Sequence, residues 1–378
     1  MKRILSLLLC LCLALSAAAC SAAETGEWSH TPAESFCGLR HTGSLSLEYA
    51  QEFAVDYYEG GYCLVSIASG DQFLAVPEGA TVPDTDIPVV SLPISNVYLV
   101  ATSTMCLFDA LDALDAISLS GTVADGWTIE SAKAAMEAGQ ILYAGKYSEP
   151  DYELITSAGC TLAIESTMIY HSPEVKEKLE ELGVAVLVDY SSYESHPLGR
   201  TEWIKLYGTL LGQEALSEEL FRQEADKLDA LESESTGKTV AFFYISSSGG
   251  YAVVRKSGDY VTQMIELAGG EYIFENLGDS ETATATVNLT LEEFYATAKD
   301  ADVVIYNSTI DGALNTLEDF LALNALLADF KTVQNNNVWC TTANLYQNML
   351  RLGTVMEEMH RIFTGDAEDT MEFLYRLQ

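Results

Sequence analysis

Basic side chains are scarce in this sequence, and several of them lie in loops that follow predicted β-strands. Lys146, Arg200, Arg255 and Lys256 all occupy such positions. An arginine guanidinium is a planar fork that donates two parallel hydrogen bonds to a carboxylate or to the oxygens of a catecholate. The pattern predicts a cationic lining for an anionic ligand, with scattered surface bases as the alternative interpretation.

Aromatic side chains accompany these cations. Tyr193 lies in the loop just before Arg200, and Tyr251 follows a predicted strand of the second half of the chain. Aromatic rings bury much apolar area at a small cost in side-chain entropy. We therefore expect these two tyrosines, together with Trp203, to form the walls of the site. The further candidates for ligand contact are Met105, Tyr170, His171 and His196.

Two runs of alternating strands and helices position these loops. Residues 44–212 and 236–378 each read as short apolar strands separated by amphipathic helices. This order predicts two α/β lobes with mainly parallel sheets flanked by helices. Ligands of such sheets bind outside the carboxyl ends of the strands. Alternating residues from Leu45 to Pro93 predict an additional antiparallel β segment at the N-terminus.

A helical stretch separates the two lobes. Thr201 is the expected N-cap of a first helix, and Gly212 is its expected C-terminal stop. Residues 213–235 predict one long backbone helix. Its roughly 20 residues at ~1.5 Å each would form a rod about 30 Å long that joins the lobes.

Composition limits the function. The 378 residues include 19 basic and 56 acidic side chains, a net charge of -37 that makes nucleic acid an unsuitable partner. The motifs G-x-S-x-G and H-E-x-x-H are absent, and the five histidines suit no dedicated metal site. We expect no enzyme and no intrinsic cofactor.

The N-terminus carries a targeting signal. Lys2 and Arg3 precede an apolar run and small residues that end at Cys20. This order is typical of a signal peptide over residues 1–19, followed by a lipid-modified cysteine and a tether over residues 20–43. The expected location is the outer face of the cytoplasmic membrane, and the alternative is an ordinary signal peptide with a chance cysteine.

Several segments in this order resemble the helical-backbone class of ABC-importer solute-binding lipoproteins, class III of the periplasmic binding proteins. They are P-I-S-N-V-Y-L-V-A, P-D-Y-E-L-I, L-G-Q-E-A-L-S-E-E-L, M-I-E-L-A-G-G-E-Y-I-F and L-T-L-E-E-F. The resemblance covers about residues 89–365. The class serves ferric siderophores, haem and cobalamin, and its zinc and manganese branch has a histidine set that this chain lacks.

The resemblance implies a monomeric receptor that binds a ferric siderophore between its lobes and delivers it to an ABC permease with its ATPase. Haem or cobalamin is the alternative ligand, with Met105, Tyr170, His171 or Tyr251 as a possible axial ligand. The resemblance also implies one permease-docking glutamate per lobe, for which the predicted positions are Glu149 and Glu275. A surface-tethered hydrolase and a non-transport sensor or adhesin are the rival classes.

Overall fold

The computed structural model describes residues 28–231, 235–274, 277 and 286–378. Residues Pro32–Gln378 form one compact unit built around three large β-sheets. Three predicted features lie outside the described residues: the signal peptide, the lipid-modification site Cys20 and the docking residue Glu275.

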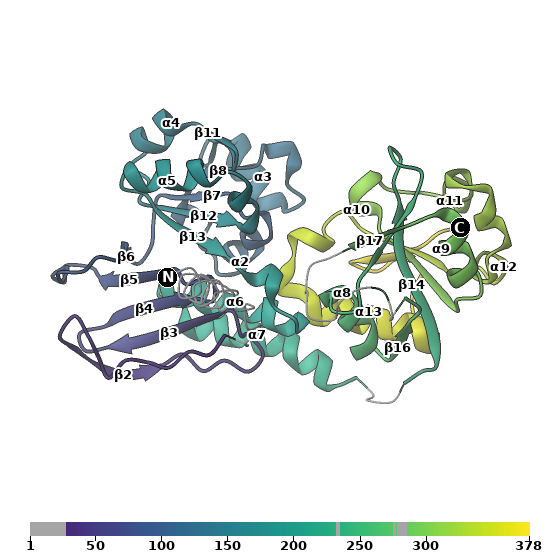
Figure 1. The fold of residues 1–378 in the computed structure, drawn as a ribbon, viewed down its shortest axis with the longest axis horizontal. Coiled ribbons are helices and arrows are strands. Elements are labelled where there is room, and N and C mark those ends of the chain that lie inside the picture. Colours follow the sequence, from purple (N-terminus) through teal and green to yellow (C-terminus); the bar gives the residue numbers. More distant parts are fainter. Residues whose placement is uncertain (1–27, 232–234, 275–276, 278–285) are drawn as a thin grey trace, which may run out of the picture. The chain divides into compact units, whose positions relative to one another are not determined.

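The first sheet forms the N-terminal part of the unit (Figure 1). Its six strands, in spatial order, are β1 (Ser35–Phe36), β2 (Leu39–Ser44), β3 (Phe53–Tyr58), β4 (Tyr62–Ile67), β5 (Gln72–Pro77) and β6 (Val89–Leu92). Neighbours are antiparallel except β5 and β6, which run parallel. The predicted antiparallel segment is confirmed. The predicted tether is wrong from Ser35 onward, because those residues pair into this sheet.

The second sheet is wholly parallel, in the spatial order β13-β12-β7-β8-β9. Its strands are β7 (Val97–Leu99), β8 (Ile117–Ser120), β9 (Leu142–Tyr143), β12 (Leu162–Ser166) and β13 (Ala185–Asp189). Helices α2 (Met105–Ala110) and α3 (Glu130–Glu137) cover one face, and α4 (Tyr152–Ser157) and α5 (Pro173–Glu181) cover the other. A hairpin of β10 (Gly145–Lys146) and β11 (Glu149–Pro150) follows β9.

The third sheet has the order β17-β15-β14-β18-β19-β20, with β16 also paired to β14. Its strands are β14 (Lys238–Ile245), β15 (Ala252–Arg255), β16 (Gly270–Tyr272), β17 (Thr286–Leu289), β18 (Val303–Tyr306), β19 (Val338–Thr341) and β20 (Leu374–Arg376). Strand β20 pairs antiparallel with β19 and forms one edge of the sheet.

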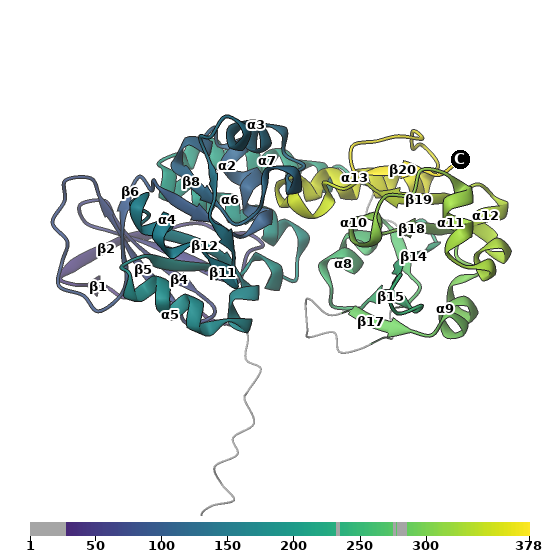
Figure 2. The same ribbon diagram turned by 90° about the horizontal axis from the view of Figure 1, so that it is seen from above.

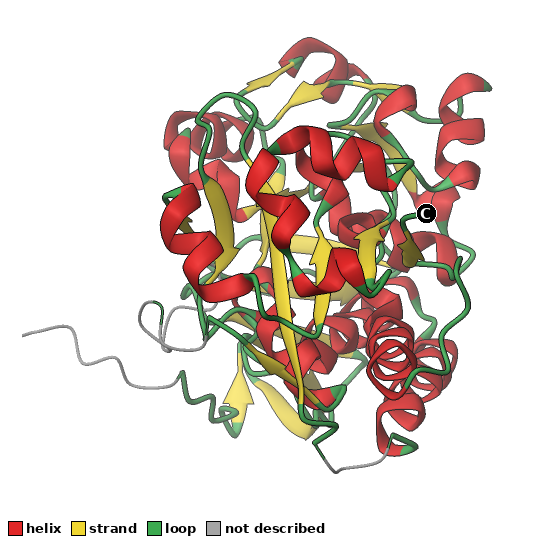
Figure 3. Ribbon diagram, turned by 90° about the vertical axis from the view of Figure 1, so that its right-hand side faces the viewer, coloured by secondary structure: helices red, strands yellow, loops and turns green. Residues whose placement is uncertain are grey.

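Helices cover both faces of the third sheet. Figures 1 and 2 show α9 (Leu291–Ala298), α11 (Leu317–Leu323) and α12 (Lys331–Gln334) on one side, and α8 (Tyr260–Leu267) and α13 (Leu352–Thr364) on the other. The short α10 (Ser308–Asp311) follows β18. The second and third sheets with their helices give the predicted two-lobed α/β fold (Figure 1), and Figure 3 distinguishes its helices and strands by colour.

Two helices connect the lobes, α6 (Pro197–Leu211) and α7 (Glu214–Asp229). Gly212 ends α6 in the left-handed conformation, with φ 69°, as predicted. The predicted N-cap Thr201 is wrong: His196 caps the helix, and its Nδ1 accepts a hydrogen bond from the N–H of Leu198 at 3.1 Å. Helix α7 ends at Asp229, so the rod is shorter than predicted.

All of α6 is buried, although it carries three charged side chains. Glu202 accepts hydrogen bonds from the backbone N–H groups of Glu48, Tyr49 and Ala50 at 2.8–3.0 Å and pairs with Lys205 at 2.9 Å. A buried charge is tolerated only when it is paired and hydrogen-bonded. These contacts join the N-terminal sheet to the connecting helices.

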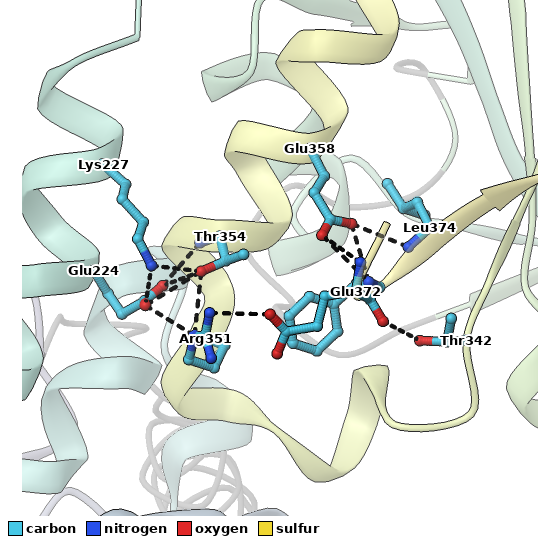
Figure 4. Close-up of polar contacts among 9 residues, drawn as sticks. Glu224, Lys227, Thr342, Arg351, Thr354, Glu358, Glu372 and Leu374 are labelled. Atoms are coloured by element: carbon cyan, nitrogen blue, oxygen red, sulfur yellow. Dashed lines mark hydrogen bonds and ion pairs between the residues drawn. The ribbon is translucent and has the colours of Figure 1, made fainter. Parts of the chain in front are cut away.

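A related polar network joins α7 to α13 (Figure 4). The Glu224 carboxylate of α7 accepts a hydrogen bond from the N–H of Thr354 at 2.8 Å and pairs with Arg351 at 3.0 Å. One turn further along α13, Glu358 accepts hydrogen bonds from the N–H groups of Phe373 and Leu374, both at 3.0 Å. The C-terminal segment is thereby attached to the helix that packs on α7.

Candidate functional site

Three tyrosines lie beyond the carboxyl ends of neighbouring parallel strands of the second sheet. Tyr170 belongs to the short 3-10 helix η4 (Thr167–His171) after β12, and Tyr190 and Tyr193 follow β13. The rings of Tyr190 and Tyr193 stack with centroids 4.6 Å apart, and those of Tyr170 and Tyr190 meet edge-to-face at 6.3 Å. Tyr170 and Tyr193 are each 42% exposed. We call these three residues the tyrosine cluster.

Tyr170 and Tyr190 of the tyrosine cluster stay protonated at neutral pH. Burial raises the pKa of the Tyr170 phenol, and burial together with the neighbouring Tyr170 raises the pKa of Tyr190. The cluster therefore offers an aromatic surface on which these two hydroxyl groups are neutral. Such a surface suits stacking against a flat or apolar part of a ligand.

A second group of polar side chains lies at the corresponding edge of the third sheet, where its parallel strands have their carboxyl ends. Asn307 directly follows β18, and its amide donates a hydrogen bond to the Tyr346 hydroxyl at 3.1 Å. The Arg255 guanidinium also donates to that hydroxyl, and it pairs with Asp259 at 3.2 Å. Burial acts to lower the pKa of Arg255, but the neighbouring Tyr346 and Asp259 outweigh it, and the pKa is raised. This arginine remains a cation.

Arg200 reaches this group from the second turn of α6. Its guanidinium carbon lies 3.9 Å from the centroid of the Tyr260 ring, and the side chain is only 8% exposed. Within the described part of the chain, Arg200 forms no ion pair and its Nε has no hydrogen-bond partner. We call Arg200, Arg255, Tyr260 and Tyr346 the arginine cluster. It holds two cations and, in Asp259, one adjacent carboxylate.

Other predicted contact residues lie near the strand ends with varied exposure. His171 and Lys146 are exposed, and Lys146 pairs with Glu149 at 3.2 Å. Tyr251 is half-buried at the end of the turn between β14 and β15. His196 is half-buried and stacks on Tyr49 with ring centroids 4.4 Å apart. Burial lowers the pKa of His196, which suits a neutral ring that accepts a hydrogen bond.

Two predicted contact residues are instead inside the protein. Met105 and Trp203 are both 0% exposed. The Trp203 ring packs against Phe53 with centroids 4.8 Å apart, and its indole N–H donates to Glu194 at 2.9 Å. The N-terminal sheet covers the α6 face that carries Trp203. We therefore remove Met105 and Trp203 from the site.

Three tyrosines of these clusters were not predicted from the sequence: Tyr190, Tyr260 and Tyr346. Tyr190 directly follows a predicted strand, so its position at a strand end was an available signal. Tyr260 and Tyr346 lie in segments with no distinctive motif. They join the site because their hydroxyl groups or rings meet arginines from distant parts of the chain.

Residues of the third-sheet half also contact the second-sheet half directly. The Gln347 side chain accepts hydrogen bonds from the N–H and hydroxyl of Thr128 at 2.9 and 2.8 Å, and its amide donates to the Gly126 carbonyl at 2.8 Å. A cavity of about 340 Å³ lies beside this contact, between Thr128 and Arg351. It contains no predicted ligand residue.

Within residues 28–231, 235–274, 277 and 286–378, no group of three or more histidine, cysteine, aspartate or glutamate side chains is placed to hold a metal ion. The same ranges contain no helix long and apolar enough to cross a membrane.

Comparison with known proteins places this arrangement among solute-binding folds. Residues 100–345 match the family described as periplasmic binding protein. Two uncharacterized lipoproteins of Methanocaldococcus jannaschii are 25% and 26% identical to the chain, covering 87% and 88% of it and 82% and 87% of their own lengths.

Solved structures agree in fold. A periplasmic haem-binding protein of Vibrio cholerae has a TM-score of 0.58 and 18% identity, covering 71% of this chain and 98% of that one. A protein of an ABC-type Fe3+-hydroxamate transport system from Saccharomonospora viridis has a TM-score of 0.53 and 19% identity, covering 72% and 93%.

Proposed function

We propose, since the chain belongs to the periplasmic binding protein family, that it captures an anionic iron complex of the ferric-siderophore type and delivers it to an ABC permease. Family membership itself makes the chain a substrate-binding protein and not an enzyme. The ligand would lie between the carboxyl ends of the strands of the second and third sheets, where the tyrosine and arginine clusters are.

The observation that carries this proposal is the Arg200 guanidinium. A buried cation without an ion-pair partner is strongly unfavourable, because the low-dielectric interior does not replace its hydration. Stacking on Tyr260, about 0.5–2 kcal/mol, and the electrostatic attraction of Asp259, which is already paired with Arg255, offset only part of that cost. An anionic ligand that reaches Arg200 and Arg255 would supply the missing counter-charge. In a chain with a net charge of -37, a cluster with two arginines and one carboxylate favours a specific anion.

The tyrosine cluster favours haem as a second candidate. The stacked rings of Tyr190 and Tyr193 offer a flat aromatic surface, and the neighbouring His171 is exposed. A haem would place its flat face against such a surface and its propionates toward arginines. Ferric catecholates would use the same two clusters, so only binding measurements separate the two ligands.

Location and partners follow the same proposal. Cys20 would carry the lipid that tethers the receptor to the outer face of the cytoplasmic membrane. Glu149 and Glu275 would contact the permease. Exposed ion pairs contribute only ~0–1 kcal/mol each, so reversing the charge of Glu149 is expected to reduce uptake without weakening ligand binding.

Titration of Arg200 variants tests the proposed ligand class. A ferric tris-catecholate, haemin and cobalamin would each be titrated into the wild type, Arg200→Ala and Arg200→Lys, with tryptophan fluorescence as the readout. A charge-assisted hydrogen bond contributes about 1.5–3 kcal/mol, so Arg200→Ala should weaken binding of the anionic complex by roughly tenfold or more. Arg200→Lys should recover part of the affinity, because it keeps the charge and loses the fork.

Arg222→Ala is the matched control, because Arg222 is an exposed arginine on α7 that pairs with Glu218 at 3.1 Å. Thermal unfolding of all variants separates lost contact from lost folding. Tight binding of a neutral complex with no dependence on Arg200 would contradict the proposed ligand class.

A further inference from the structure

The Tyr346 hydroxyl lies between two other polar groups of the third-sheet half, the Arg255 guanidinium and the Asn307 amide. We propose that this hydroxyl binds the ligand directly: it donates a hydrogen bond to an anionic oxygen that also accepts one from Arg255, and Asn307 is the positioning residue that sets this direction. The inference deepens the proposed function and rests on it for the location of the site.

Both partners of the Tyr346 hydroxyl are donors. The Arg255 guanidinium donates to its oxygen, and the Asn307 side-chain NH2 group donates to it at 3.1 Å. Neither a guanidinium nor an amide NH2 group can accept a hydrogen bond, whereas a hydroxyl has two lone pairs and one hydrogen. The two bonds therefore use the lone pairs. Among the described residues, no hydrogen bond uses the hydrogen of this hydroxyl, so it remains available to a ligand.

The direction of the Asn307 amide is fixed by its other contacts. Its carbonyl oxygen accepts hydrogen bonds from the N–H and the hydroxyl of Thr309, at 3.3 and 2.6 Å, and so caps α10. The opposite orientation would place the NH2 group against the Thr309 N–H, donor against donor. The NH2 group therefore faces Tyr346. Because Asn307 is 0% exposed, the surrounding core holds this arrangement.

The other polar atoms beside Tyr346 also leave donors for a ligand. Each carboxylate oxygen of Asp259 already has a donor, the N–H of Val261 at 2.9 Å and Arg255 at 3.2 Å, and the side chain is only 1% exposed. Arg255 and Tyr346 are half-buried. The guanidinium carries more N–H groups than its bonds to Asp259 and Tyr346 use. Because Arg255 and Tyr346 are hydrogen-bonded to each other, one ligand oxygen can accept from both.

The Tyr346 phenol keeps its hydrogen at neutral pH. Burial raises the pKa of Tyr346, and the opposing effect of Arg255 does not cancel it. A carboxylate or phenolate oxygen accepts the hydrogen bonds from both residues, whereas an ammonium group would face them with donors of its own and leave them unpaired. We therefore expect the site to select an oxygen that carries no hydrogen. If Tyr346 only held Arg255 in place, its hydrogen would have no part in affinity.

The test changes the hydrogen of Tyr346. The ferric complex of 2,3-dihydroxybenzoate and haemin are titrated by fluorescence quenching into the wild type, Tyr346→Phe and protein with 3-fluorotyrosine at position 346. Tyr346→Phe should weaken binding by about tenfold or more. Fluorine makes the phenol a stronger donor and a weaker acceptor, so 3-fluorotyrosine should tighten binding. Unchanged or weaker binding with 3-fluorotyrosine would overturn the inference. The matched control is 3-fluorotyrosine at position 375, where the Tyr375 hydroxyl donates to the Leu314 carbonyl at 2.7 Å; it should leave affinity unchanged.

Asn307→Asp tests the positioning role. The carboxylate keeps one oxygen for the Thr309 cap and puts a second oxygen in place of the NH2 group, so that the Tyr346 hydroxyl donates to it. The added charge weakens anion binding by itself, so the informative readout is the effect of fluorine. In Asn307→Asp, 3-fluorotyrosine at position 346 should no longer tighten binding. Tightening equal to that in the wild-type background would show that Asn307 does not set the direction.

A measurement without iron separates this inference from the proposed function. The ¹⁹F signal of 3-fluorotyrosine at position 346 is followed while benzoate, an oxygen acceptor, or benzylamine, a cation of similar size, is added. Benzoate should shift the signal saturably, and benzylamine should not. If the wild type binds neither iron complex, the proposed ligand class fails and the ¹⁹F signal alone decides the role of Tyr346. No shift with benzoate, or equal shifts with both compounds, would refute that role.

Discussion

Glu165 on β12 has a buried carboxyl group with no hydrogen-bond partner in the described part of the chain, and this leads to a quantitative prediction of how stability depends on pH. Its side chain is 0% exposed, and neither carboxylate oxygen has a hydrogen-bond partner. Burial raises the pKa of this carboxyl to about 8. Glu165 raises the pKa values of Tyr98 and Tyr152 in turn, and neither of these residues provides a positive charge. At neutral pH the native protein therefore keeps Glu165 mostly protonated.

The sign of the pH dependence follows from this shift. The unfolded chain releases the proton near the ordinary pKa of 4.5, whereas the native state retains it to about 8. Stability from Glu165 is thus fully present below pH 4.5 and is lost as pH rises toward 8. At ~1.36 kcal/mol per pKa unit, the total loss is about 5 kcal/mol, and roughly 3 kcal/mol of it has occurred by pH 7.

Glu165→Gln removes the titration and keeps the shape. The neutral amide is buried without hydrogen-bond partners, as is the protonated acid. Wild type and variant should therefore be nearly equal in stability at pH 4.5. The variant should be more stable by about 3 kcal/mol at pH 7, and by about 5 kcal/mol at pH 9. Urea unfolding followed by far-UV circular dichroism at these three pH values measures the difference.

The exposed Glu177 of α5 provides the control, since Glu177→Gln changes the same charge at the surface. Glu194 and Glu358 also have pKa values raised by burial, to about 7, so the wild-type curve alone does not isolate Glu165. The difference in unfolding free energy between Glu165→Gln and the wild type isolates the contribution of Glu165. A difference that is independent of pH, or a variant that is less stable at pH 9, would refute the reasoning.

Three further predictions concern other sites. Glu202→Gln should destabilise the protein by about 1.5–3 kcal/mol and expose the loop at Ala50 to proteolysis, because it replaces the charge-assisted hydrogen bonds from that loop with neutral ones and leaves Lys205 paired with Glu218 only, among the described residues; a protection pattern equal to that of the wild type would contradict this. Gln347→Ala removes three hydrogen bonds, at ~1 kcal/mol each, and should broaden the distribution of distances between spin labels on the two lobes; an unchanged distribution would show that Gln347 does not restrain them. Cys20→Ser should abolish incorporation of labelled fatty acid, and retained labelling would disprove lipid attachment there.

Much of the fold was predictable because secondary structure depends on residues close together in sequence. The alternation of apolar and polar residues from Leu45 to Pro93 correctly predicted antiparallel strands, among them the neighbouring pair Phe53–Tyr58 and Tyr62–Ile67. The alternation of apolar strands and amphipathic helices correctly predicted two α/β lobes. Gly212 ended α6 as expected, since glycine takes the left-handed conformation without strain.

The candidate site was only partly predictable. Strand-end positions indicated the segments with Tyr170 and Tyr193, which follow neighbouring parallel strands and so share one edge of the second sheet. Arg255 was expected in a loop, but it ends β15, which runs antiparallel to β14. Whether these residues contact the ligand remains a prediction. Trp203 had the same local signals. It is buried because it packs against a sheet that contains Phe53, a residue 150 positions earlier in the sequence.

What the sequence alone determined is therefore local: which segments are strands or helices, where several of them end, and the overall excess of acidic side chains. The tertiary structure decided which charges are buried and which are satisfied. Glu202 lies 152 residues from Ala50, from whose N–H it accepts a hydrogen bond, whereas Glu165 and the Nε of Arg200 have no such partner within the described residues. The reason is that the energy of a buried charge depends on contacts from distant segments, and no pattern within a few residues contains them.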